Sequence, residues 1–294
     1  MITLTLKQPV NGVPLEAESI CPDVMAPLDH GAISALPVYL GKRQCRIDDF
    51  FTVEGEKNDE IDVRGDLKKV RWIGRGMTRG RISIDGNAGM HLGAYIKGGT
   101  IEVTGAPSDW LGGEMSGGLI RVAGNAGGQI GAAYRGSPRG MTDGTILIGG
   151  SAGLEVGMRM KRGLIVIGGP VRDFAGLEMK GGTIVLLSGA ELRTGAWMQR
   201  GTIISLKTIP LLPSFLYSSS YAPTFVGVLA RQLASLGLSL PFDPQAGTYQ
   251  RFLGDTSVVG KGEILVWSAH AATSAWRIRA STSSSVVCDE QIAG

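Results

Sequence analysis

Seven copies of a glycine-rich unit occupy positions 61–201, and this periodicity constrains the fold more than any other feature of the chain. The steps between successive copies are 21, 19, 19, 26, 19 and 19 residues. Each copy reads Ile-x-Val/Ile-x-Gly and continues to Gly-x-x-Met-x-x-Gly. A fixed period of about 20 residues is the signature of a solenoid, in which each unit stacks on the next. The copies begin at Ile61, Ile82, Ile101, Ile120, Ile146, Ile165 and Ile184.

The second copy shows how one unit can turn. Residues 82–85 alternate apolar and polar side chains, which is the period of a half-buried strand. Gly86 and Gly93 then permit corners, because glycine adopts positive φ at no steric cost. Ten residues after the first isoleucine of a copy stand Leu92, Leu111, Ile130, Val156 and Ala175. Fourteen residues after it stand Ile96, Met115, Met160, Met179 and Met198, with Met141 shifted by an insertion.

These columns predict an all-β fold, a right-handed parallel β-helix solenoid of about seven turns, each about 19 residues long and glycine-rich, capped at both ends. Helical repeats are excluded by the glycines, each of which costs a helix interior about 1 kcal/mol. Leucine-rich repeats need Leu-x-x-Leu-x-Leu, which is absent.

The flanking segments predict four regions. Residues 1–60 do not follow the unit and are expected to form a strand-rich N-terminal cap, followed by the β-helix over 61–205. Residues 206–270 are expected to form a C-terminal cap. Apolar residues at helical spacing in 222–240 predict a helix docked on the far end, and 260–267 predicts a closing strand. The last stretch, 271–294, is serine-rich and is expected to be a mobile tail.

The basic residues are concentrated in the repeated part. Residues 61–205 hold 18 Lys and Arg against 11 Asp and Glu, a net +7, while the remainder holds 11 against 15, a net −4. Two unit positions are basic in several copies: Lys97, Lys161 and Lys180 share one, and Arg79, Arg162 and Arg200 share the next. Stacking would align these side chains along one edge. They indicate either a solvated face or an electrostatic track for a polyanion or an acidic partner.

A seven-residue insertion in the fourth copy accounts for the 26-residue step. It falls within residues 134–144 and carries Arg135, Pro138 and Arg139. Insertions within repeats map to loops on one face, often the binding face. Tolerated drift is the alternative interpretation, and Arg135 and Arg139 remain candidate contacts.

A search for catalytic chemistry finds little. His30, His91 and His270 have no neighbouring Cys or carboxylate at metal-ligand spacing, so neither a metal site nor a catalytic residue is predicted. His91 shares a unit position with Trp110, Gln129, Glu155 and Phe174, which favours surface packing. The three cysteines are scattered, and no basic run is interleaved with aromatics as in a nucleic-acid platform. No apolar run approaches the roughly 20 residues that span a membrane, and the first residues do not resemble a signal peptide. A cytoplasmic protein without membrane contact is therefore expected.

The unit resembles a known family. The stretch from Met115 to Val122 is similar to the glycine-repeat β-helix of the C subunit of formylmethanofuran dehydrogenase and of the C-terminal domain of glutamate synthase large subunits. The inserted loop, 136–144, looks like an element of both. The size of the chain and its closing residues 254–264 favour the first group. Within it, residues 211–240 look closest to the bacterial version, the C subunit of the formyltransferase/hydrolase (Fhc) complex of methylotrophs.

This resemblance implies a structural, non-catalytic subunit of an enzyme complex in one-carbon metabolism and formaldehyde oxidation. Such a complex converts formyl-tetrahydromethanopterin to formate through a formyl-methanofuran-type carrier. The partners it implies are an amidohydrolase subunit that holds zinc, a formyltransferase subunit and one further subunit, known as the A, D and B subunits. It implies no cofactor on this chain. The carrier bears a glutamate chain, which the basic edge would guide.

Two alternatives stay open: the C subunit of a tungsten or molybdenum formylmethanofuran dehydrogenase, and a detached glutamate synthase β-helix domain. A carbohydrate-active β-helix is disfavoured because such enzymes cluster acids in one groove, and here the acids are dispersed.

Overall fold

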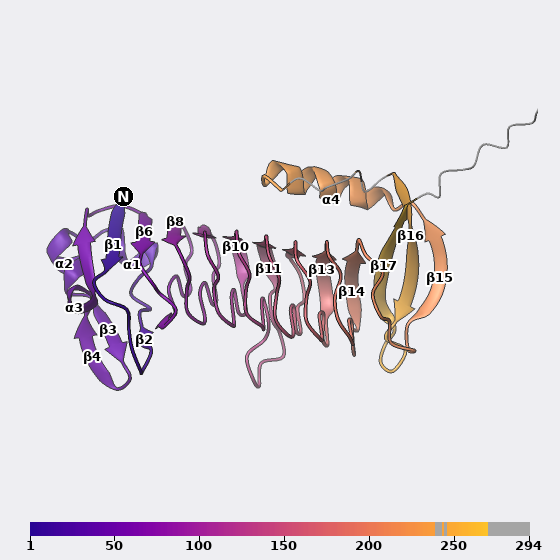
Figure 1. The fold of residues 1–294 in the computed structure, drawn as a ribbon, viewed down its shortest axis with the longest axis horizontal. Coiled ribbons are helices and arrows are strands. Elements are labelled where there is room, and N and C mark those ends of the chain that lie inside the picture. Colours follow the sequence, from indigo (N-terminus) through magenta and orange to yellow (C-terminus); the bar gives the residue numbers. More distant parts are fainter. Residues whose placement is uncertain (239–242, 244–245, 270–294) are drawn as a thin grey trace, which may run out of the picture.

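The computed structural model describes residues 1–238, 243 and 246–269. Within these residues the strands form two sheets, one of 13 strands and one of four. The large sheet runs along the whole length of the elongated molecule, in the order β15-β16-β17-β14-β13-β12-β11-β10-β9-β8-β6-β1-β5 (Figure 1). Its central strands are parallel, while β5, β15 and β16 join antiparallel at the two ends. The small sheet has the order β4-β3-β2-β7 and belongs mainly to the N-terminal segment.

The strands of the large sheet are β1 (Ile2–Leu6), β5 (Phe51–Glu54), β6 (Glu60–Arg64), β8 (Arg81–Asp85), β9 (Thr100–Val103), β10 (Ser116–Val122), β11 (Asp143–Ile148), β12 (Leu164–Ile167), β13 (Lys180–Leu186), β14 (Arg200–Ser205), β15 (Leu216–Tyr221), β16 (Gly247–Gly254) and β17 (Lys261–Ala269). Those of the small sheet are β2 (Leu15–Glu16), β3 (Pro37–Leu40), β4 (Arg43–Arg46) and β7 (Val70–Arg71). The helices are α1 (Pro22–Met25), α2 (His30–Ser34), α3 (Ile47–Phe50) and α4 (Thr224–Ser235).

The predicted fold class, a closed right-handed parallel β-helix solenoid, is wrong. The structure is a large mixed sheet with few helices, and in the described part of the chain no further sheets close the units on their other sides. Outside the named strands, the remaining sides contribute isolated bridges such as Leu67–Ala88 and Ala152–Val171. The physical reason lies in the unit itself. Only the Ile-x-Val/Ile segment is long enough for a ladder, because left-handed corners interrupt the other sides every few residues.

The corners are stacked by hydrogen bonds that run in both directions. A non-glycine residue with positive φ stands at the same place in each unit, for example His91 (φ 63°) and Trp110 (φ 65°). This conformation turns the residue's N–H toward the next unit, so that His91 donates to the carbonyl of Asp109 at 3.0 Å. Two residues later the donation runs backward, from Gly93 to the carbonyl of Ile73. Each corner is thereby bonded to both of its neighbours, which keeps the units in register.

The core lies between the large sheet and the corners. The first isoleucine of every unit and the Met column are fully buried, as the sequence pattern predicted for these positions; Ile101, Met115 and Met160 are each 0% exposed. The N-terminal segment joins the same core through Ile2 and Leu4, because β1 pairs with β6 in register. The division at residues 60 and 205 stays a prediction, and the expected tail at 271–294 lies outside the described residues.

Helix α4 does not cover the far end, where it was expected. It lies along the outer face of the large sheet, beside β11 to β14 (Figure 1). Val226 and Leu233 of the helix are buried against Val166, Val185 and Ile204 of the strands. The helix lies there because these strands are apolar on both faces, and the outward face also needs cover.

Candidate functional site

The predicted basic residues lie at one corner of the units, at or just before the start of the strands. Backbone bonds confirm that Lys97, Lys161 and Lys180 are equivalent: each donates its N–H to the carbonyl of the Met-column residue one unit earlier. Arg200 pairs in register with Lys180 on one side and Lys261 on the other. The row is not continuous, because Ser116 and Thr142 occupy the same place in the intervening units.

Most cations of this corner have no ion-pair partner among the residues that the structure describes. Three arginines of the large sheet are paired: Arg64 with Asp62 at 2.6 Å, Arg81 with Glu102, and Arg251 with Glu263 at 2.7 Å. The corner cations instead make no ion pair or side-chain hydrogen bond to any other residue that the structure describes. They are Arg79, Lys97, Lys161, Arg162, Arg200 and Lys261, and on the inserted loop Arg135 and Arg139 make none either.

The inserted loop is folded back onto later units. Lys180 Nζ donates to the carbonyl of Pro138 at 2.8 Å, and Arg159 Nη1 donates to the carbonyl of Ser137 at 3.0 Å. Arg159 is itself fixed by Glu178, at 2.8 Å. The loop is therefore held in place, and Arg135 and Arg139 stand exposed on it. Of the eight predicted residues, the structure thus brings Lys180 to the loop segment that holds Arg139, and it leaves Arg79 and Lys97 several units away.

At its other end the loop enters a group of aromatic rings, which we call the aromatic cluster: Trp72, His91, Tyr95, Trp110 and Tyr134. Trp72 stacks on His91 with ring centroids 4.1 Å apart and planes at 9°. Tyr134, the first residue of the loop, stacks on Trp110 at 4.6 Å. All five side chains are half-buried. The loop is therefore anchored by an aromatic ring at one end and by Arg159 and Lys180 at the other.

The two polar rings of the cluster are neutral at neutral pH. The Nδ1 of His91 lies 2.9 Å from the phenol oxygen of Tyr134, within hydrogen-bond distance. Burial lowers the pKa of His91 to about 4, and the charge of Arg71 acts in the same direction. Burial also raises the pKa of the Tyr134 phenol. A hydrogen-bonded, uncharged pair of this kind suits packing and recognition better than proton transfer near pH 7.

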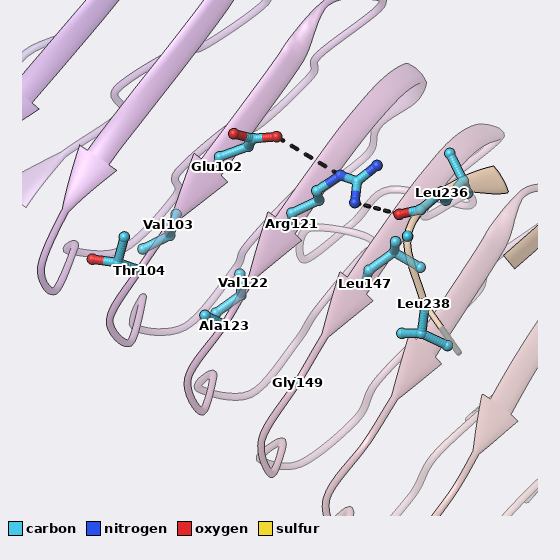
Figure 2. A pocket seen from close by; sticks show the side chains of 11 residues that line it. Glu102, Val103, Thr104, Arg121, Val122, Ala123, Leu147, Gly149, Leu236 and Leu238 are labelled. Atoms are coloured by element: carbon cyan, nitrogen blue, oxygen red, sulfur yellow. Dashed lines mark hydrogen bonds and ion pairs between the residues drawn. The ribbon is translucent and has the colours of Figure 1, made fainter. Parts of the chain in front are cut away.

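A groove of about 440 Å³ opens where α4 ends against the outer face of the sheet (Figure 2). Arg121 projects from β10 into it. One edge of its guanidinium faces Glu102, and Nη1 donates to the carbonyl of Leu236, directly after the helix (Figure 2). Leu147 and Leu238 supply apolar walls. A cation at a helix C-terminus satisfies carbonyls that have no partner within the helix, so Arg121 fixes the end of α4.

Sequence reasoning missed the aromatic cluster. The signal was present, because Trp72, His91 and Trp110 share one unit position. The insertion concealed the contribution of Tyr134, which lies 43 residues beyond His91. Among the described residues, no group of three or more His, Cys, Asp or Glu is placed to hold a metal ion, and no helix of that part is long and apolar enough to cross a membrane.

Comparisons with known proteins agree with this architecture. The family model for the GXGXG motif matches residues 65–209. The C subunit of molybdenum-containing formylmethanofuran dehydrogenase 1 of Methanothermobacter marburgensis is 42% identical over 83 residues, which are 28% of this chain and 21% of that protein. Its counterpart from the tungsten-containing formylmethanofuran dehydrogenase 2 of the same organism is 38% identical over 87 residues, 28% of this chain and 32% of that protein.

A solved structure extends the likeness to nearly the whole chain. It is the crystal structure of the formyltransferase/hydrolase complex from Methylorubrum extorquens in complex with methylofuran. One of its chains is 30% identical and matches with a TM-score of 0.82 over 90% of this chain and 98% of that chain. This protein belongs to the family of that chain of the formyltransferase/hydrolase complex. The resemblance inferred from the sequence is therefore confirmed. The matches of this C-subunit homologue to the curated relatives span only about a fifth to a third of those proteins.

Proposed function

We propose that this chain is a structural, non-catalytic subunit of a multisubunit enzyme that handles a formyl group on a methanofuran-type carrier. The partners would be the other chains of a formyltransferase/hydrolase complex: an amidohydrolase that holds zinc, a formyltransferase and one further chain. The carrier and tetrahydromethanopterin would be substrates of the whole complex. The observation that carries this proposal is the match to a chain of such a complex over 98% of that chain.

The groups with shifted pKa values support a structural role, because the contacts of each are accounted for within the fold. His91 contacts Tyr134, Glu178 is paired with Arg159, and the buried Asp255 accepts from the backbone N–H of Trp197 at 2.9 Å and from Ser257. The pKa of Glu178 is lowered chiefly by its hydrogen bond from Arg159. In an active site such shifts serve a reacting group, whereas here they serve stacking and capping.

We further propose that the unpaired cations of the corner guide an anionic chain carried by the substrate. Cations that make no ion pair within the described residues attract a polyanion at long range. Lys161 and Arg162 lie at the corner of one unit and Arg200 lies at the corner two units later, with Lys180 in the unit between them. Lys161, Arg162 and Arg200 are all exposed. Neighbouring parallel strands lie about 4.8 Å apart. The carboxylates of an extended anionic chain that follow one another every few ångströms could therefore meet cations of neighbouring units. The contact needs neither a pocket nor base specificity.

The test uses the purified complex. Replacing Lys161, Arg162 and Arg200 together by Glu is expected to raise the apparent KM for carrier with a long anionic tail about tenfold at low salt, with kcat unchanged. The difference should shrink as salt rises, because exposed charges are screened within about 8 Å at physiological ionic strength. Replacing the paired Arg64, Arg81 and Arg251 by Glu is the charge-matched control. Equal KM values for both triple variants would contradict the proposal and would mean that the corner cations form only a solvated face. Turnover by this chain alone would contradict the structural assignment.

A second candidate is the redox version of the assembly. The 42% and 38% identities are to molybdenum- and tungsten-containing dehydrogenase subunits, and they favour this candidate within the matched segment. Metal analysis of the complex separates the two. Molybdenum or tungsten would favour the dehydrogenase, and zinc without either would favour the formyltransferase/hydrolase.

A further inference from the structure

The aromatic cluster stands on strained backbone. Trp72, His91, Tyr95 and Trp110 have φ between 60° and 66°, in the left-handed region. This conformation costs a residue with a bulky side chain roughly 1–2 kcal/mol, whereas glycine adopts it freely. Gly76 occupies the place of Tyr95 one unit earlier, with φ 67°. The fold therefore accepts glycine there, and aromatic residues at these corners are kept for what their side chains contact.

Within the described part of the chain, the rings of the cluster contact one another and the guanidinium of Arg75, and all five stay only half-buried. On the outer face of the late strands the molecule covers its apolar side chains itself. Leu147, Val166, Val185 and Ile204 face outward from neighbouring strands, and α4 buries them to 5% exposure or less. The five rings of the cluster stay half-buried, although aromatic side chains contribute more on full burial than these aliphatic ones. The cluster thus resembles a surface that is completed by another molecule.

Cations surround the rings. Arg75 lies over the rings of Trp72 and Tyr95, 5.0 and 5.6 Å from their centroids, and is paired with Glu18. Arg71 approaches His91 closely enough to lower its pKa, and it makes no ion pair or side-chain hydrogen bond within the described residues. Arg135 follows Tyr134 and is likewise unpaired and exposed. Trp, Tyr and Arg are the residues that most often dominate the binding energy of protein interfaces.

We propose that the aromatic cluster is the surface on which another protein subunit of the complex docks, and that the docking subunit presents apolar side chains ringed by carboxylates. The apolar centre would bury the five rings, and the carboxylates would meet Arg71 and Arg135, which make no ion pair within the residues that the structure describes. This inference rests on the proposed role as a subunit of a complex, and it names the face that serves that role. The cation corner and the cluster are then separate sites, for a flexible polyanion and for a folded partner.

Site-specific photo-crosslinking in the purified complex tests the surface. The chain carries benzoylphenylalanine in place of Tyr95, whose ring contacts only one other ring of the cluster, that of Tyr134. The control carries it in place of Tyr217, which is 60% exposed on β15 at the other end of the molecule. We expect an adduct with one other subunit from position 95 and a much weaker one from position 217. No adduct from position 95, or an adduct with a second copy of this chain, would overturn the inference.

Charge reversal tests the carboxylate rim. Arg71→Glu combined with Arg135→Glu should weaken retention of the docking partner at least tenfold, because each reversal places like charges opposite one another. Arg172→Glu combined with Lys207→Glu, in the later part of the chain, is the matched control. Thermal unfolding of each isolated chain shows that the variants fold. Unchanged retention overturns the inference while the complex itself persists. A wild-type chain that purifies without partner subunits overturns the proposed function as well.

Discussion

The early and late units share one backbone but place their apolar side chains on opposite surfaces. One register row faces outward from the large sheet, and it changes character midway. It is polar at Asp62, Ser83, Glu102 and Arg121, and apolar at Leu147, Val166, Val185, Ile204 and Leu265. The corner row changes in the reverse sense. It is aromatic at Trp72, His91 and Trp110, and polar or mixed at Gln129, Glu155, Phe174 and Arg193.

The two halves also differ in what covers the apolar surface. In the late half α4 covers the sheet face, and the corners are occupied by ion pairs such as Arg159–Glu178 and Arg193–Asp173. In the early half ion pairs occupy the sheet face, and the aromatic corners contact Tyr134 and Arg75 but stay half-buried. The difference teaches that the stack itself is indifferent to these side chains. The side chains of each surface instead match the element, or the proposed partner, that packs on that surface.

The largest expected effect tests whether the backbone is the same in both halves. A Cβ on Gly112 would lie 2.8 Å from Ile146 Cδ1, and one on Gly176 would lie 2.6 Å from Ile203 Cδ1. Both glycines have positive φ, so Gly112→Ala and Gly176→Ala should each cost about 3–4 kcal/mol, from left-handed strain and overpacking. Chemical denaturation measures the two free energies of unfolding.

Gly76→Ala is the control for that pair of variants, because its φ is also positive while nothing lies within 4 Å of an added Cβ. It should cost about 1 kcal/mol. A cost at Gly112 far below that at Gly176 would mean that the early units are more loosely packed, and the comparison of side chains on a common backbone would fail.

A smaller effect tests the cover of the late half. Leu233 of α4 is 1% exposed against the apolar strands, so Leu233→Ala should cost about 2–3 kcal/mol by leaving a cavity. Val228 of the same helix is 58% exposed, and Val228→Ala should cost less than about 0.5 kcal/mol. Thermal unfolding monitored by circular dichroism compares them. Equal costs would show that α4 is not packed on the sheet in solution.

The smallest expected effect is a dependence of the stability on pH that arises from His91, a residue of the early half. Its pKa is about 4 in the folded chain and about 6.5 when unfolded. Between these pH values the unfolded chain binds a proton at His91 that the folded chain does not bind. His91 therefore leaves the free energy of unfolding unchanged above pH 6.5 and lowers it progressively as the pH falls toward 4.

His91→Gln introduces the residue that stands at the equivalent corner, Gln129. The variant should lack this loss of stability in acid, so its Tm should fall less on acidification than that of the unchanged protein, by about 2–4 °C. Melting curves at about pH 7 and about pH 4.5, on either side of the unfolded-state pKa, measure it. Identical falls in Tm for both proteins would place His91 in a solvated environment in the folded state.

The interior and the family were predictable from the chain alone. The isoleucine and methionine columns are buried as their spacing indicated, and the glycine-rich unit identified the family that the comparisons confirm. The closed β-helix was wrong because spacing shows where corners fall, but not whether the sides between them are long enough to pair as strands. The basic corner was recognisable as a column, yet spacing could not reveal that Lys180 binds the carbonyl of Pro138.

The sequence by itself therefore determined what lies inside, because burial of one face repeats with every unit and is written in residue type. Only the tertiary structure decided what lies on the outside. Tyr134 reaches His91 across 43 residues, and Leu236 reaches Arg121 across 115. Contacts of such range depend on the path of an insertion and on where a helix comes to rest. Both are settled by the packing of whole surfaces, which no local pattern of residues records.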